Sequence, residues 1–109
     1  MAFDEALADR VRAALTGELD VSERKMFGGL AFMVCGNMAL GVIGDGLMVR
    51  VGKEDWVDAL VRPHAREMDF TGRSMRGMVV VDSEGLEASS DLDAWIDSGL
   101  SYARSLPEK

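Results

Sequence analysis

The stretch RKMFGGLAFMVCGNMALGVIGDGLMVRV, from Arg24 to Val51, decides the fold of this 109-residue chain. Its apolar side chains alternate along three short runs, at residues 30–35, 38–43 and 47–51. A period of two is typical of β-strands, whose successive side chains point to opposite faces of a sheet. Gly36-Asn37 and Gly44–Gly46 separate the runs, and such residues form tight hairpin turns. We therefore predict an antiparallel meander of three strands.

The double glycine at Gly28 and Gly29 precedes the first of these strands. A phosphate-binding loop needs its glycines between a strand and a helix, or in the pattern GxxxxGK[ST], and this chain has neither arrangement. Glycine also adopts backbone angles that are closed to other residues, which lets a chain turn or bulge. We predict that this pair shapes the backbone, and that the RKMF segment before it is a short strand.

Three other segments have the periodicity of amphipathic helices, in which apolar residues recur every three to four positions. They are residues 3–17, 53–61 and 91–106. Pro63 should end the middle helix, because the proline ring disfavours helix at the preceding residue. The apolar stripe of that helix is expected to comprise Trp56, Val57, Leu60 and Val61.

The remaining segment supplies one more strand. Residues 78–82 are rich in valine, which favours β-structure, and a turn is expected at Thr71-Gly72. Hairpin-linked strands followed by helices indicate an antiparallel sheet covered by helices. We predict an α+β fold in a single domain, residues 1–109, with four to five strands and three helices in the order α-β-β-β-(β)-α-β-α.

Composition limits the class of protein. The chain has one cysteine, no apolar run of the roughly 20 residues that a membrane helix requires, and an acidic N-terminus unlike a secretory signal. A cytoplasmic location without a membrane association is therefore expected. The net charge is −7, and only residues 24–76 have a positive balance, of +2. An acidic protein repels phosphate backbones, so nucleic acid is not the expected partner.

Several separated blocks resemble the N-terminal domain of the TfoX (Sxy) family, over about residues 5–105. The family's basic turn with a double glycine, its strand ending in a basic residue and its later G-R-x-M block all have matches in this chain. The first block falls on Lys25, Met26, Phe27, Gly28 and Gly29; the second on Leu47, Val49 and Arg50; the third on Gly72, Arg73 and Met75.

This resemblance implies an α+β fold similar to that of the type III secretion chaperones. In the family's founding members a C-terminal domain follows, and the whole protein regulates competence genes. Because the sequence ends at Lys109, we expect a stand-alone domain without that second part, which leaves the competence role open.

Four cationic residues are candidates for partner binding: Lys25, Arg50, Arg73 and Arg76. They would form one patch if the turn before the meander lay beside the loop before the last strand. Their guanidinium and ammonium groups would then bind an acidic partner. The alternative is that they form ion pairs with the surplus acids of this chain, because exposed charges usually have no special role.

Met33 and Met48 are candidates for an apolar contact surface, because both lie on the face of the meander opposite Leu30, Phe32 and Val49. If no helix covers this second face, it should bind a partner, to which flexible methionine side chains adapt well. The alternative is that a helix covers it and the methionines fill the core.

Neither catalysis nor cofactor binding is expected. His64 is the single histidine, and Cys35, the only cysteine, belongs to an apolar strand, so no Cys–His pair is indicated. Asp45, Asp82 and Glu84 occur at predicted turns with no spacing that requires a metal.

The sequence thus favours a non-enzymatic protein-interaction domain with a regulatory or adaptor role, and we expect it to form a homodimer. The structural turn residues should be Gly28, Gly29, Gly36, Asn37 and Gly72. A transcriptional regulator associated with nucleic acid is the alternative, and an enzyme or small-ligand domain ranks third.

Overall fold

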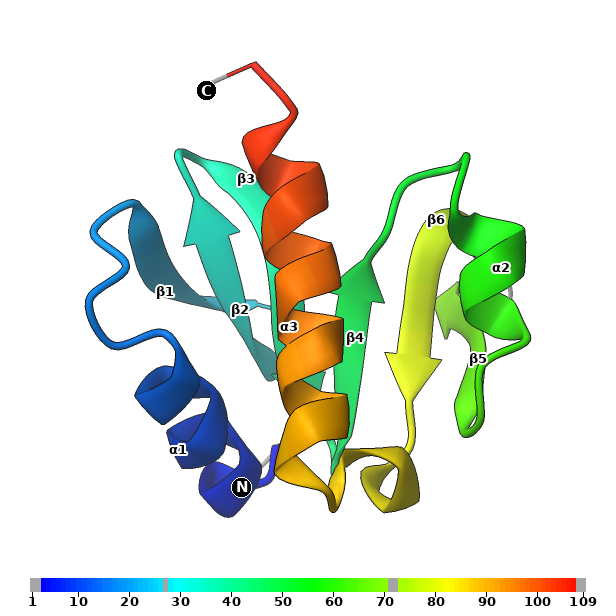
Figure 1. Cartoon of the computed structure of the whole chain (residues 1–109), viewed down its shortest axis with the longest axis horizontal. Coiled ribbons are helices and arrows are strands. Elements are labelled where there is room, and N and C mark those ends of the chain that lie inside the picture. The colour runs from blue at the N-terminus through cyan, green and yellow to red at the C-terminus, as the bar shows by residue number, and fades with distance from the viewer. Residues whose placement is uncertain (1–2, 27, 71–72, 108–109) are drawn as a thin grey trace.

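A computed structural model of the chain describes residues 3–26, 28–70 and 73–107. It describes the side chains of these residues except those within 69–75. These described residues form three α-helices, one short 3-10 helix and six β-strands. In chain order they are α1 (Glu5–Ala14), β1 (Val21–Met26), β2 (Gly29–Val34), β3 (Asn37–Ile43), β4 (Gly46–Arg50), α2 (Trp56–Leu60), β5 (Ala65–Phe70), β6 (Arg73–Val81), the 3-10 helix (Ser83–Leu86) and α3 (Ser89–Arg104) (Figure 1). The predicted α+β class is confirmed.

The strands of the described residues form one antiparallel sheet in the order β1-β2-β3-β4-β6-β5. The predicted meander is present, and residues 24–26 of the RKMF segment belong to a longer strand, β1, while Phe27 lies outside the described residues. The predicted number of strands, four to five, was too low because β5 contains Arg66, Glu67 and Asp69 and resembles a polar loop in sequence. As β5 lies at the edge of the sheet, charged side chains are tolerated there.

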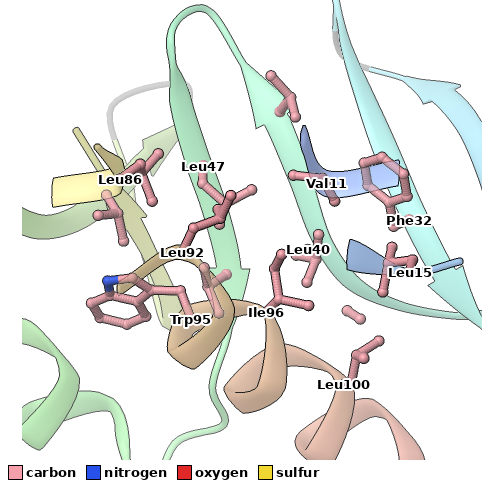
Figure 2. Packing of buried hydrophobic residues seen from close by; sticks show 14 of the residues in the cluster. Val11, Leu15, Phe32, Leu40, Leu47, Leu86, Leu92, Trp95, Ile96 and Leu100 are labelled. Atoms are coloured by element: carbon pink, nitrogen blue, oxygen red, sulfur yellow. The ribbon is translucent and has the colours of Figure 1, made fainter. Parts of the chain in front are cut away.

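One hydrophobic core lies between the sheet and the helices, which all pack on the same face (Figure 1). Figure 2 shows Leu92 and Ile96 of α3 beside Leu40 and Leu47 of the sheet, and Val11 of α1 with Leu15, which directly follows α1, beside Phe32. Helix α3 approaches the sheet closely at Gly99, where a Cβ atom would lie only 2.7 Å from the Ala39 carbonyl oxygen. The glycine therefore sets the separation between α3 and β3.

The two glycines of the double-glycine pair are needed for different reasons. Gly28 has a φ angle of +76°, in the left-handed region that favours glycine. Gly29 begins β2, and a Cβ atom on it would lie 2.5 Å from the carbonyl oxygen of Val42 on β3. The pair therefore leads into a strand and shapes the backbone, as the sequence predicted.

The first turn of the meander lies one residue earlier than predicted. Cys35 and Gly36 have φ angles of +50° and +85°, and Val34 pairs with Asn37. Positive φ at both central residues is the geometry of a tight two-residue hairpin. Asn37 is instead a buried strand residue, and its side-chain amide donates a hydrogen bond to the Pro107 carbonyl, 2.9 Å away. Cys35 is exposed in the turn, not part of an apolar strand.

Helix α2 is shorter than predicted and presents only part of its apolar stripe to the core. Trp56 and Leu60 pack against the core, whereas the side chains of Val57 and Val61 are 64% and 80% exposed. Residues one position apart on a helix point about 100° away from each other, so a single turn cannot bury all four. The predicted turn residue Gly72, with Thr71, lies outside the described residues.

Candidate functional site

A groove of about 1270 Å³ lies between α3 and α2, and the end of β4 together with the adjoining middle part of β6 forms its floor. One wall is the C-terminal half of α3, including Ser98, Ser101 and Tyr102. The other wall is α2 together with the loop that precedes it. Pockets for small molecules typically have volumes of about 300–1,000 Å³, so this groove has room for a larger ligand.

Eight of the eighteen described residues that line the groove have charged side chains. Four are cationic and four are anionic: Arg50, Lys53, Arg62 and Arg76, and Glu54, Asp55, Asp58 and Asp97. Sites for small organic ligands are mostly lined by apolar side chains, with few polar groups. The lining therefore has more charged side chains than such sites usually have, although most of its exposed area is apolar, and its formal charges cancel.

Two glycines fix the floor of the groove. The amides of Val51 and Gly52 both donate hydrogen bonds to the Gly77 carbonyl, at 2.8 and 3.0 Å. Gly52 and Gly77 have φ angles of +87° and +91°. A Cβ atom on Gly52 would also overlap the ring of Tyr102, so glycine lets α3 lie against the end of β4.

Arg50 is held in place at this end of the groove. Its Nη1 atom donates a 3.4 Å hydrogen bond to the Met38 carbonyl, and its guanidinium carbon lies 5.4 Å from the centre of the Tyr102 ring. Arginine has five N–H donors, so most of them remain for another ligand. The guanidinium is therefore positioned by the fold before any partner arrives.

Aromatic contacts hold the two walls in position. The indole Nε1–H of Trp56 donates a 3.0 Å hydrogen bond to the Met78 carbonyl and so fixes the start of α2 to β6. The guanidinium carbon of Arg62, just after α2, lies 3.5 Å from the ring centre of Trp95 on α3. These contacts connect α2 with the sheet and with α3 and so fix the two walls relative to each other.

The structure brings only part of the predicted cationic patch together. Arg50 and Arg76 both line the groove. Lys25 does not, because it lies on β1 at the far edge of the sheet and pairs with Leu30, near the opposite ends of the strands. Arg73 begins β6, but its side chain lies outside the described part.

Several ion pairs hold other parts of the surface. Arg12 pairs with Asp9 and Glu23, Arg66 with Asp82, and Arg104 with Glu18 and Asp20. The hydrogen bond from Arg104 lowers the pKa of Asp20. None of these pairs, within the described ranges, involves Lys25, Arg50, Lys53 or Arg76.

The methionine-rich second face is largely closed within the single chain. Met48, Met68, Met78 and Val80 form a cluster there and are only 3–7% exposed. Met33 and Met38 are half-buried. The helices of the described residues all lie on the other face, so the methionines bury one another instead of filling a core under a helix. Met48 therefore offers little surface, and Met33 somewhat more.

Cys35 and His64 lie apart in the sheet, whereas the amide of Asp82 donates a 2.9 Å hydrogen bond to the His64 carbonyl. Cys35 lies in the β2–β3 turn, while His64 precedes β5, and strands β4 and β6 separate these parts of the sheet. Asp82 forms its ion pair with Arg66. Over the described ranges, no three His, Cys, Asp or Glu side chains lie close enough to hold a metal ion. No described helix is both long and apolar enough to cross a membrane.

Sequence reasoning missed half of the cations and all of the acids that line the groove. Lys53 and Asp58 lie in the predicted helix at residues 53–61 and Asp97 in that at residues 91–106, where a charged side chain is typical of a solvated face. One local signal was present, because Gly52-Lys53, just after β4, and Arg76-Gly77, within β6, each place a cation beside a glycine. That these two sites meet follows only from the pairing of β4 with β6.

Comparisons with known proteins place the chain in a family. A search of curated proteins and a search of solved structures each found no match. Residues 13–103, which are most of the chain, match the TfoX N-terminal domain. This range includes the double glycine, the whole sheet and nearly all of α3. The chain therefore belongs to the TfoX N-terminal domain family.

Proposed function

We propose that this chain is a non-enzymatic protein-interaction domain with a regulatory or adaptor role in the cytoplasm, and that its binding site is the groove between α2 and α3. The observation that carries the proposal is a groove of about 1270 Å³ with eight charged side chains in its lining. Standard protein interfaces are about as polar as the remaining surface, and Arg is enriched in them. The lining contains three arginines, Arg50, Arg62 and Arg76.

The walls of the groove also favour a protein partner. Their positions are set by the Trp56–Met78 hydrogen bond and the Arg62–Trp95 contact, so little ordering is needed when a partner binds. On the outer side of α2, the exposed Val57 and Val61 add apolar surface beside one wall. A groove with charged side chains next to exposed apolar side chains suits a partner that covers both.

Two alternatives are less well supported. A regulator that binds nucleic acid would need a cationic face, whereas the charges of the groove cancel and the chain has a net charge of −7. A homodimer formed through the methionine-rich second face has little surface available, since four of its residues are already buried. The partner in the groove is either a second copy or another protein, and light scattering of the purified chain distinguishes these.

Site-specific photo-crosslinking in the native cell tests the proposal. A photoreactive phenylalanine analogue replaces Ser101, which is exposed on the α3 wall, and in a control variant it replaces Thr16, which is exposed at the end of α1. We expect a discrete cross-linked protein with the Ser101 variant alone. Equal cross-linking from both sites, or none from Ser101, would count against the groove as the binding site.

A further inference from the structure

Three cations gather at one end of the groove because two distant segments meet there. Arg50 is the last residue of β4, Lys53 follows Gly52, and Arg76 precedes Gly77. The two hydrogen bonds that the Val51 and Gly52 amides donate to the Gly77 carbonyl hold these segments together. A Cβ atom on Gly77 would lie 3.4 Å from the Lys53 amide nitrogen. We call Arg50, Lys53 and Arg76 the cationic end of the groove.

Among the described residues, these cations form no ion pair of the kind that other arginines of the chain form. Arg12, Arg66 and Arg104 each contact a carboxylate at 2.8–3.0 Å. Across the described residues, no carboxylate lies within ion-pair distance of the cationic end, although the chain has 19 acidic residues against 12 basic ones. Like charges brought together repel each other, so an external anion would stabilise this arrangement.

Glu54 follows Lys53 in the chain but forms no ion pair with the cationic end within the described residues, and the other three acids of the groove lie on its walls. Asp55 is the residue before α2 and Asp58 lies in its first turn, where acidic side chains interact favourably with the positive end of a helix. Asp97 projects from the opposite wall, α3. A long polyanion would pass these acids and be repelled, whereas a segment with one or two carboxylates could reach the cationic end alone.

We propose that the cationic end binds the carboxylates of an acidic segment of a partner protein. This inference rests on the proposed function and adds the chemistry of the partner. Arg50 is already positioned by Met38 and Tyr102, so it offers its remaining N–H donors in a fixed direction. Lys53 and Arg76 are exposed beside it and add long, adaptable cations.

Selection from a random dodecapeptide library displayed on phage tests the inference. The bait is the full chain, compared with the Lys53→Gln/Arg76→Gln variant and with a control, Arg24→Gln/Lys25→Gln on β1, which loses the same charge. All four side chains are exposed, so these variants should fold. We expect Asp- and Glu-containing peptides to be enriched. In fluorescence anisotropy they should bind about tenfold more weakly to the groove variant and unchanged to the control.

The other outcomes separate this inference from the proposed function. Binding is also compared with a Ser101→Trp variant, whose larger side chain is designed to fill the groove. Peptides without acids that bind wild type but not Ser101→Trp would overturn the acidic partner and retain the groove as a protein site. Acidic peptides that bind the Lys53→Gln/Arg76→Gln variant normally, or no enrichment at all, would overturn the inference. A labelled DNA duplex that bound through Lys53 and Arg76 would overturn it in favour of nucleic acid.

Discussion

The Gly29→Ala substitution tests whether close contact between backbones, and not flexibility, requires glycine at the start of β2. Alanine in a strand is ordinarily about 0.5–1 kcal/mol more favourable than glycine. Here its Cβ atom would lie 2.5 Å from the Val42 carbonyl oxygen. Ordinary C···O contacts are about 3.3–3.6 Å, so β2 and β3 would have to separate by roughly 1 Å.

The two effects can be compared in free energy. Forcing an extra carbon into a well-packed site costs about 1–3 kcal/mol, and this contact is with rigid backbone, so the upper part of the range applies. After subtraction of the ordinary gain from alanine, we expect a net loss of about 1–2 kcal/mol. For a domain of this length, 1 kcal/mol lowers the Tm by roughly 4–8 °C.

Urea unfolding followed by circular dichroism measures this loss, with thermal unfolding as a second readout. Gly28→Asn is the matched control, because Gly28 is exposed and asparagine tolerates the left-handed backbone that its φ of +76° requires. We expect this control to change stability by a few tenths of a kcal/mol at most. A Gly29→Ala variant as stable as wild type, or more stable, would refute the close-contact argument.

Three further substitutions test a core contact, a buried polar contact and an ion pair. Leu47→Ala removes a fully buried side chain and should cost about 2–5 kcal/mol in urea titrations; a loss no greater than that of an exposed site would contradict its place in the core. Asn37→Ala removes the hydrogen bond to Pro107 and should cost about 1 kcal/mol by the same assay, while an unchanged midpoint would mean that the C-terminal segment is not held there. Because the Arg104 hydrogen bond lowers the folded-state pKa of Asp20, its carboxylate adds stability above the unfolded pKa of about 4 and loses it as the pH falls through the folded value. The difference in unfolding free energy between wild type and Asp20→Asn should therefore be present at neutral pH and disappear at strongly acidic pH, and a difference independent of pH would refute the assignment.

Local patterns in the sequence determined most of the fold. Alternating apolar residues and glycine-rich turns specify β2, β3 and β4, because strand periodicity and hairpin geometry depend on neighbouring residues. The same reasoning placed α1 and α3 and gave the two glycines of the double-glycine pair a backbone role. It failed where local signals are weak: β5 has the charges of an edge strand, and the Cys35–Gly36 turn differs from Gly36-Asn37 by one residue.

Only the tertiary structure decided which candidate residues meet. The sequence grouped Lys25 with Arg50 and Arg76, but the strand order puts Lys25 at the opposite edge of the sheet. Pairing of β4 with β6 brings Lys53 beside Arg76, although 22 residues separate them in the chain. Long-range pairing is set by the collective packing of the sheet and helices, which no short segment encodes by itself. The sequence therefore determined the elements and their faces, and the folded sheet determined the groove.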